Sequence, residues 1–292
     1  MSRTWTLRLR PSALCLSALL LSPLLAAAST PWESFERPTA GRAEAIGKYS
    51  NGCLLGGDAL PHAGPGYQVV RLERRRNFGH PQLVEYLQEL GERVAQRNIG
   101  TMLVADMAMP RGGRFSRGHR SHQSGLDADI WLRLDVPKLP LDQRWGYNDV
   151  PAQLYVNRKT WVATDDFRWA QAELIRLAAS DERVARIFVN PAIKKNLCQR
   201  RWKEDRSWLR KVRPWWGHDA HFHVRLRCPA GNDCADQNPP PPGEGCDAEV
   251  DTWLADLRRP PKPRDPNAVK PTPSPTPPPP QRCQVLLDIE NG

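Results

Sequence analysis

The sequence predicts an α+β fold, and three patterns of side chains support that prediction. Residues 221–227 and 126–132 each alternate between polar and apolar side chains, which is the period of a half-buried β-strand. Residues 83–94 carry apolar side chains at spacings of three and four, which is typical of an amphipathic helix. Residues 260–280 consist largely of proline, which indicates an extended segment outside the core.

The first 28 residues have the composition of a secretory signal peptide. Three arginines precede an apolar run at residues 13–25, and three alanines at residues 26–28 resemble a cleavage site. The apolar run is too short for a comfortable membrane span. We therefore expect cleavage after Ala28, export of the mature chain and no stable membrane insertion.

The segments that follow alternate between loops and regular elements. Residues 29–67 are rich in glycine and proline and are expected to form a loop-rich arm that contains Cys53. A strand is expected at residues 69–72, a helix at 83–94 and a buried strand at 102–107.

The second half of the chain repeats this mixture. Residues 136–163 are polar and are expected to form an insertion. Helices are predicted at residues 167–179 and 191–198, with a strand between them at 184–189. A short helix is predicted at residues 248–257, ahead of the proline-rich segment.

Six cysteines remain after the leader is removed, and their number favours disulfide bonds. No two of them form a C-x-x-C pair, which argues against a structural zinc site. Cys228 and Cys234 are close enough in sequence to close a small loop, but spacing alone leaves the pairing open. The six are Cys53, Cys198, Cys228, Cys234, Cys246 and Cys283.

The chain is basic, with a formal net charge of +10. An exported basic protein suits an anionic polymer such as the cell wall, or an acidic membrane surface. Nucleic acid is the common partner of a basic cytosolic protein, and export argues against it here. A basic surface that serves only solubility explains the charge equally well, so charge alone decides nothing.

Histidines and aspartates gather in residues 118–132 and 218–227, the two segments that contain the alternating stretches, and this predicts a catalytic zinc site. Such a site takes three protein ligands and leaves a fourth position for water. If the two strands pair in an antiparallel sheet, then His122, Asp129 and His223 project into one cleft. Five of the seven histidines are found there: His119, His122, His218, His221 and His223.

The remaining polar residues of these segments have expected roles beside the metal. His221 is a candidate general base, or a stabiliser of the charged intermediate. His119 is expected to orient a ligand or to meet a second metal, and Asp127 to fix the tautomer of an imidazole. The H-E-x-x-H motif of common metalloproteases and the G-x-S-x-G motif of serine hydrolases are both absent.

In six segments the sequence resembles the penicillin-insensitive murein endopeptidases. These are periplasmic zinc peptidases of the wider group that includes lysostaphin-type and D-alanyl-D-alanine peptidases. The likeness extends over essentially the whole chain after the leader, including its proline-rich end. The segments are residues 113–115, 118–123, 125–130, 186–194, 208–215 and 221–229.

This resemblance implies a small antiparallel β-sheet core that carries the zinc site, with helices and long loops around it. It implies hydrolysis of D-alanyl–meso-diaminopimelyl cross-links in peptidoglycan, by a zinc peptidase domain at residues 29–257. A proline-rich tail at residues 258–292 would then be tethered by Cys283. The implied disulfides are Cys53–Cys283, Cys198–Cys246 and Cys228–Cys234.

The resemblance also assigns roles to individual residues. It carries the zinc ligands onto His122, Asp129 and His223, and the assisting catalytic histidine onto His221. His119 and His218 match positions that are histidine in the family, so each is expected near the metal or the substrate. A second metal in the family involves His119 and the insertion, but residues 136–163 contain no histidine here, which argues against a second zinc.

Two alternatives remain open on the sequence alone. One is a non-catalytic wall-binding protein with a structural zinc, and the other is a D,D-carboxypeptidase or dipeptidase. The oligomeric state is also open, with a homodimer as one option. Trp215 and Trp216, just ahead of the last strand, are predicted to form a wall of the cleft.

Overall fold

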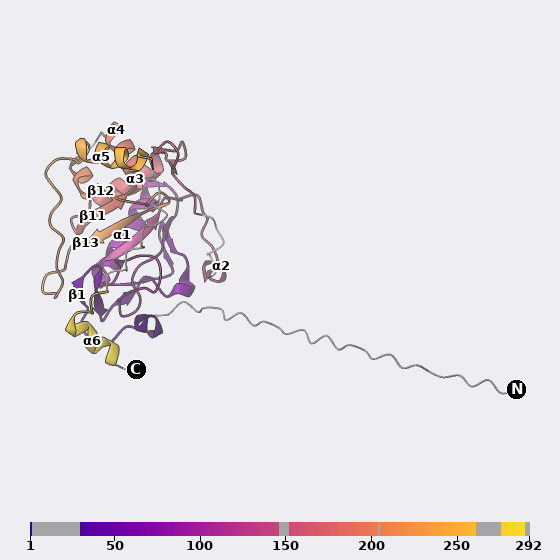
Figure 1. The fold of residues 1–292 in the computed structure, drawn as a ribbon, viewed down its shortest axis with the longest axis vertical. Coiled ribbons are helices and arrows are strands. Elements are labelled where there is room, and N and C mark those ends of the chain that lie inside the picture. The colour runs from indigo at the N-terminus through magenta and orange to yellow at the C-terminus, as the bar shows by residue number, and fades with distance from the viewer. Residues whose placement is uncertain (2–29, 146–151, 204, 261–275, 290–292) are drawn as a thin grey trace.

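A seven-stranded mixed sheet is the centre of the fold in this computed structural model, which describes residues 1, 30–145, 152–203, 205–260 and 276–289 (Figure 1). Its strand order is β12-β11-β13-β8-β7-β5-β4. In that order the strands are β12 (Val212–Pro214), β11 (Val184–Val189), β13 (His221–Leu226), β8 (Asp127–Trp131), β7 (Met102–Val104), β5 (Tyr67–Val69) and β4 (Ala63–Gly64).

The expectation of an antiparallel sheet is correct for the centre and wrong for the whole. β13 pairs antiparallel with both β11 and β8, whereas β11–β12 and β5–β7 are parallel pairs. A parallel pair needs a crossover connection, and helices supply one in each case. α1 (Pro81–Arg97) lies between β5 and β7, and α4 (Pro191–Gln199) with η3 (Ser207–Lys211) lies between β11 and β12.

The strands predicted at residues 126–132, 184–189 and 221–227 are confirmed as β8, β11 and β13. Two other predicted strands differ from the expectation, because the strand at residues 102–107 is shorter and the strand at residues 69–72 shares only Val69 with β5 (Tyr67–Val69). β7 ends at Val104, and β5 ends at Val69 because a 3-10 turn, η2 (Leu72–Arg74), follows it. This turn is flanked on both sides by left-handed residues that no strand accommodates, Arg71 (φ 60°) and Arg75 (φ 51°).

The four predicted helices are confirmed, and side-chain caps explain where two of them begin. Pro81 opens α1, and the His80 side chain accepts a hydrogen bond from the Gln82 backbone nitrogen at 3.2 Å. The Asn190 side chain caps α4 in the same way, accepting from Ala192 at 3.0 Å. The other two are α3 (Trp169–Ala179) and α5 (Ala248–Arg258).

The main core lies between one face of the sheet and these helices. Ile130 of β8 and Phe222 of β13 are fully buried in one cluster with Leu87 of α1, Leu174 of α3 and Ile193 of α4. Because side chains alternate along a strand, the residues between these apolar ones point to the opposite face. The sheet therefore directs one set of side chains into the main core and the other set to the opposite face, where a smaller apolar cluster that includes Leu103 and Trp131 is also buried.

The N-terminal arm is more regular than its composition suggested. Residues 44–55 form a hairpin of β1 (Glu44–Lys48) and β2 (Asn51–Leu55), after the 3-10 turn η1 (Pro31–Ser34). β3 (Asp58–Ala59) pairs with β6 (Phe78–Gly79). Glycine does not prevent strand formation here, since Gly47 lies within β1 and Gly52 within β2, so the expectation of a loop-rich arm was wrong for the hairpin.

The insertion at residues 136–163 contains a short helix, α2 (Leu141–Trp145), and a small hairpin of β9 (Val156–Asn157) and β10 (Val162–Ala163). Residues 146–151 lie outside the described part of the chain.

The C-terminal tail is only partly as expected. Most of its proline-rich segment, residues 261–275, lies outside the described residues. Residues 281–288 are not extended but form α6 (Gln281–Asp288), which buries Cys283 and Leu286 against Trp32 and Phe35. In Figure 1 this helix lies beside β1, at the opposite end of the molecule from α4 and α5.

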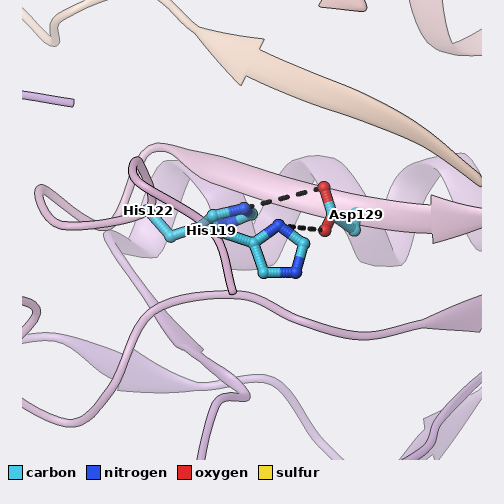
Figure 2. A group of neighbouring side chains, drawn as sticks. All are labelled: His119, His122 and Asp129. Carbon is cyan, nitrogen blue, oxygen red and sulfur yellow. Dashed lines mark ion pairs between the residues drawn. The ribbon is translucent and has the colours of Figure 1, made fainter. Parts of the chain in front are cut away.

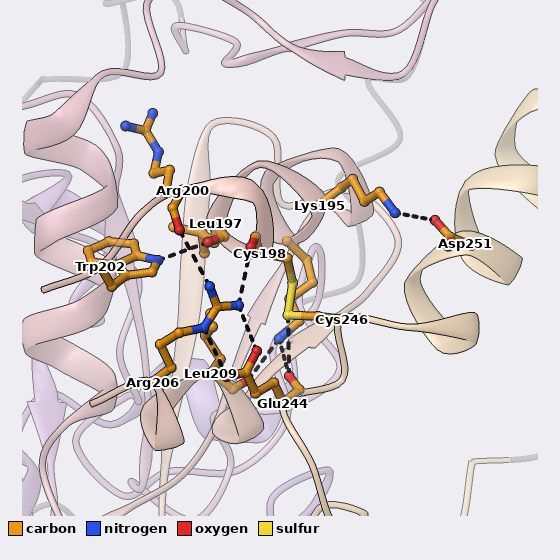
Figure 3. Close-up of a disulfide and its surroundings, with 11 residues drawn as sticks. Lys195, Leu197, Cys198, Arg200, Trp202, Arg206, Leu209, Glu244, Cys246 and Asp251 are labelled. Carbon is orange, nitrogen blue, oxygen red and sulfur yellow. Dashed lines mark hydrogen bonds and ion pairs between the residues drawn. A yellow bond between two sulfur atoms is a disulfide. The ribbon is translucent and has the colours of Figure 1, made fainter. Parts of the chain in front are cut away.

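Three disulfides connect the elements. Cys53–Cys283 joins β2 to α6, and Cys228–Cys234 closes a short loop after β13. Cys198–Cys246 joins α4 to the segment before α5, and Figure 3 shows Arg206 and Glu244 beside it. Arg206 donates two hydrogen bonds to the Glu244 carboxylate, at 2.9 and 2.6 Å.

The sequence predicted a signal peptide and no stable membrane insertion. The predicted signal peptide falls on residues 2–29, which lie outside the described part of the chain. Among the described helices, none has the length and hydropathy needed to cross a bilayer.

Candidate metal centre

The pairing of β8 with β13 builds the floor of the site. Their antiparallel register places His223 opposite Asp129 and Arg225 opposite Asp127. Opposite residues of neighbouring strands share a face of the sheet, so these four side chains project from the face away from the main core. The alternating polar residues noted in both segments are therefore brought together by strand pairing.

A loop before β8 adds two further histidines. His122 has a left-handed backbone (φ 72°), and its backbone nitrogen donates to Asp127 Oδ2 at 3.0 Å. His122 Nδ1 lies 3.3 Å from the Asp127 carbonyl oxygen, so Nε2 is the nitrogen that faces the site. The same loop carries His119, whose ring centroid is 4.9 Å from that of His122.

Asp129 is the point where the histidines converge. Its Oδ1 lies 3.0 Å from His223 Nδ1 and 3.6 Å from His122 Nε2. Its Oδ2 lies 3.1 Å from His119 Nδ1 and 3.7 Å from His221 Nε2. Figure 2 shows His119 and His122 approaching the two oxygens from the loop. Each carboxylate oxygen thus faces one pair of imidazoles.

Two atoms of this cluster fit a bound cation. His122 Nε2 and Asp129 Oδ1 are buried, and neither makes a hydrogen bond of good geometry within the described residues, although His223 Nδ1 lies 3.0 Å from Asp129 Oδ1. Leaving buried polar atoms unpaired is costly, and a metal ion would satisfy both at once. Imidazole and carboxylate are the donors that zinc and similar divalent ions take in proteins.

Among the residues that the structure describes, one group of three mutually close ligands is found, and it differs from the predicted trio by one member. The ligand atoms of His119, His122 and Asp129 all lie within 4.8 Å of one another. His223 stands outside that group, although its Nδ1 is the nitrogen nearest to Asp129 Oδ1. Both sets share His122 and Asp129.

The charges around the site hold its aspartates ionised. Burial would raise the pKa of Asp127, but Arg225 and His223 outweigh it and hold that pKa well below its usual range. Arg225 binds the carboxylate with two hydrogen bonds, of 2.8 and 3.0 Å. Burial is likewise outweighed at Asp129, where the neighbouring histidines lower the pKa.

The histidines differ in their proton affinity. Burial lowers the pKa of His122 to about 4. Burial would also lower the pKa of His223, but Asp127 and Asp129 together raise it to about 9 in the metal-free protein. Burial lowers the pKa of His221, so its imidazole is neutral at pH 7 and free to accept a proton.

His218 lies at the rim of the cluster. Its ring centroid is 5.0 Å from that of His221, and its Nδ1 donates to the Trp216 carbonyl oxygen at 2.7 Å. Burial and the two neighbouring histidines, His221 and His223, lower the pKa of His218 to about 3. It is therefore a neutral side chain that contacts the site from the segment before β13.

All seven predicted site residues thus lie in one cluster, and the structure adds one that the sequence did not suggest. Asp106 is buried, and its Oδ2 lies 3.2 and 2.9 Å from Arg74 and Arg76 and 3.8 Å from His119 Nε2. The available signal was a carboxylate inside the apolar run at residues 102–107, where an unpaired charge would be costly.

Comparisons with known proteins agree on one family. A family model described as penicillin-insensitive murein endopeptidase matches residues 45–288. A Klebsiella pneumoniae subsp. pneumoniae protein of that name is 48% identical over 277 residues, which are 92% of this chain and 95% of the relative. A Yersinia enterocolitica protein is 48% identical over 281 residues, 94% and 95% of the two chains. A Salmonella newport protein is 47% identical over 285 residues, 96% and 98% of the two chains.

Proposed function

The chain belongs to the family of penicillin-insensitive murein endopeptidases, and we propose that it is a periplasmic zinc enzyme that hydrolyses D-alanyl–meso-diaminopimelyl cross-links. Membership makes it a metallopeptidase that acts on peptidoglycan. The choice of zinc, of the cross-link and of the residues below is our proposal. The buried His122 Nε2 and Asp129 Oδ1, which make no hydrogen bond of good geometry within the described residues, are the observation that carries it.

We propose His122 Nε2, Asp129 Oδ1 and His223 Nδ1 as the zinc ligands. Ligand atoms at about 2.0–2.1 Å from a tetrahedral zinc are separated from each other by about 3.3–3.4 Å. The separations of 3.6 Å (His122 to Asp129) and 3.0 Å (His223 to Asp129) are close to that value. Bound zinc would polarise the scissile carbonyl and lower the pKa of water to about 7.

Asp127 and Arg225 are proposed to hold two of these ligands in place. The Asp127 carboxylate accepts from the His122 backbone nitrogen at 3.0 Å and lies 3.4 Å from His223 Nε2. Arg225 in turn holds the Asp127 carboxylate by donating a hydrogen bond to each of its two oxygens. A carboxylate that orients a ligating imidazole is common around zinc, and it also keeps the ligand basic.

His221 is proposed as the general base. Its side chain retains 28% of its exposure, whereas the ligands His122 and His223 are buried, so it can meet substrate and water. As a neutral imidazole it would accept the proton of the attacking water and return it to the departing amine. The Asp129 carboxylate, 3.7 Å away, would stabilise the imidazolium that forms between these steps.

His119 is proposed to orient Asp129 rather than to hold a second metal. Its Nδ1 lies 3.1 Å from Asp129 Oδ2, and its Nε2 faces Asp106. The insertion at residues 136–163 contains no histidine that could complete a second site.

Three disulfides support a location outside the cytoplasm, because such bonds persist in an oxidising compartment. We propose the periplasm, with residues 1–28 as the signal peptide. The peptidase domain would extend over residues 29–257 and the tail over residues 258–292.

The test uses purified mature protein and a cross-linked muropeptide dimer, with product masses followed with and without a chelator. We expect monomers whose formation stops with chelator, returns with zinc and ignores penicillin. Release of free D-alanine would instead identify a carboxypeptidase. An intact dimer, with protein that holds one zinc, would contradict the proposal and favour a wall-binding role.

A further inference from the structure

A pocket beside the metal centre has no role in the chemistry described so far. It has a volume of about 340 Å³ and lies where β11, β12 and the start of α5 meet. Its walls include the aromatic rings of Phe188, Trp215 and Trp253, and two arginines, Arg186 and Arg213, contribute its charge.

Strand register places this pocket on the same face of the sheet as the metal centre. Phe188 of β11 pairs with His223 of β13 on one side and with Arg213 of β12 on the other. Arg186 pairs with Arg225 in the same way. The Phe188 ring centroid lies 5.5 Å from the rings of both His223 and Trp215, so a single phenyl ring separates the pocket from a proposed zinc ligand.

The two arginines of the pocket are not fully neutralised or hydrogen-bonded by the described residues around them. Arg213 is 5% exposed and donates to Glu249, while its Nη1 has no hydrogen-bond partner in the described part of the chain. Arg186 donates to the Asn238 carbonyl oxygen at 2.6 Å, and its Nε is also without a partner there. Burial and the neighbouring Arg213 and Arg225 lower the pKa of Arg186, which reports this excess of cations.

Arg186 differs from its two neighbours in having no acidic partner. Arg225 is held by Asp127 and Arg213 by Glu249, but among the described residues no carboxylate lies within salt-bridge distance of the Arg186 guanidinium. A guanidinium is the side chain best shaped to bind a carboxylate, and a half-buried one without a counterion is an anion site.

We propose that this pocket binds a carboxylate of the peptidoglycan stem peptides, with Arg186 as its principal ligand and the aromatic rings excluding water around it. The identity of the substrate rests on the proposed function. Two strand spacings of about 4.8 Å separate β12 from β13. An extended peptide spans that distance in about three residues. The bound carboxylate therefore belongs to the residues immediately around the scissile bond.

The experiment measures binding of cross-linked dimers to zinc-loaded His221→Ala protein, in which the substrate stays intact. Three dimers are compared: one with free carboxylates, one amidated on the stem that supplies the carbonyl, and one amidated on the stem that supplies the amine. Amidation on one of the two stems should weaken binding about 10- to 100-fold, because a charge-assisted hydrogen bond is lost. The stem that shows the effect identifies the carboxylate.

In the same His221→Ala background, Arg186→Gln should weaken binding of the dimer with free carboxylates by a similar factor. It should not change binding of the amidated dimer that the unsubstituted pocket binds weakly. Arg186→Lys should recover part of the loss. Arg97→Gln, an exposed arginine on α1, is the matched control and should change nothing. Equal zinc content and melting temperature establish that each variant is folded.

Equal binding of all three dimers would overturn the proposal, and so would an Arg186→Gln effect that is the same for free and amidated dimers. The comparison of dimers uses unaltered pocket residues, so it decides even if the arginine variants fail to fold. Failure of the proposed function has a different signature. An intact dimer with unsubstituted zinc-loaded protein refutes the endopeptidase, whatever the pocket binds.

Discussion

At the scale of single residues, the site depends on one carboxylate that serves two pairs of imidazoles. Asp129 Oδ1 faces His122 and His223, and Oδ2 faces His119 and His221. The first pair is buried and the second is partly exposed. The buried pair is suited to hold a metal, and the partly exposed pair is suited to contact substrate. Substitutions in the two pairs should therefore have different effects.

Replacing His221 with alanine should abolish most of the activity and keep the metal. Loss of a general base typically costs about 10²- to 10⁴-fold in kcat. Zinc content by mass spectrometry should remain that of the unsubstituted protein, whereas His122→Ala should lose it. His62→Ala, an exposed histidine outside the cluster, is the matched control and should retain full activity. Loss of zinc from the His221 variant would instead make His221 a ligand.

The pKa of His223 predicts how the metal-free protein responds to pH. Asp127 and Asp129 raise that pKa from 6.5 to about 9. A folded pKa above the unfolded one contributes stability that is complete below pH 6.5 and is lost as the pH rises through 9. Urea unfolding in chelator should therefore show this contribution fading over that interval.

The control for this prediction is His223→Gln, which has no titrating group at that position. Burial lowers the pKa of Lys194 to about 7, which acts in the opposite direction above that pH. The difference in unfolding free energy between the two proteins therefore reports His223. A difference that does not change from pH 6.5 to pH 9 would contradict the assigned pKa.

At the scale of elements, the pairing of β8 with β13 joins the two halves of the site, and the ion pair between Arg225 and Asp127 connects the two strands. Arg225→Leu leaves a fully buried carboxylate without its guanidinium. Breaking a buried pair in this way costs about 3–5 kcal/mol. Denaturant unfolding should show that loss, together with weaker zinc binding because Asp127 orients two proposed ligands.

A control for Arg225 is Arg133→Leu, since Arg133 pairs with the exposed Asp135 and such pairs contribute about 0–1 kcal/mol. If both variants lose the same stability, then the Arg225–Asp127 pair is no more than a surface contact.

The sequence predicted these central elements because each carries a strong period. β8, β11 and β13 were recognisable from alternation or from a long apolar run, and α1 from its spacing of three and four. The edge strand β12 was not predicted and β5 was predicted only at Val69, because three residues are too few to show a period. The parallel pairs that those strands form depend on helical crossovers, so the mixed sheet could not be read from local patterns.

The site was predictable where its residues stand on segments with a strong period, and not where it depends on contacts between distant parts of the chain. His223 and Asp129 stand on strongly alternating strands, so their meeting followed from one assumption about pairing. Asp106 and Arg186 were not suggested, because a single carboxylate after an apolar run or one arginine on a strand is common. Their significance depends on neighbours such as His119 and Phe188, which come from distant parts of the chain.

At the scale of the whole molecule, the two ends of the described chain are bound together. Cys53–Cys283 links positions 230 residues apart, and α6 covers a separate small core with Trp32 and Phe35. Arg111 adds hydrogen bonds to the carbonyl oxygens of Leu286 and Ile289. The same small core includes Phe115, whose ring stacks on that of His122 with centroids 5.9 Å apart, so this end of the molecule stabilises the fold and also supports one wall of the metal centre.

Removing this bridge with Cys53→Ser and Cys283→Ser should cost about 2–5 kcal/mol of unfolding free energy. The paired change Cys228→Ser and Cys234→Ser is the control, because it opens a loop of only 6 residues and chain entropy predicts a smaller loss. Calorimetric melting of both proteins compares them. An equal or larger loss for the short loop would show that native-state contacts, not chain entropy, determine the effect.

The most direct test of the account is an anomalous-difference map from crystals of the zinc-loaded protein, recorded on both sides of the zinc absorption edge. We expect one peak, bound by His122 Nε2, Asp129 Oδ1 and His223 Nδ1, with His221 nearby and uncoordinated. A peak bound by His119 in place of His223 would contradict the proposed ligand set. It would also contradict the assignment of metal binding to the histidines at Asp129 Oδ1 and of other roles to those at Oδ2.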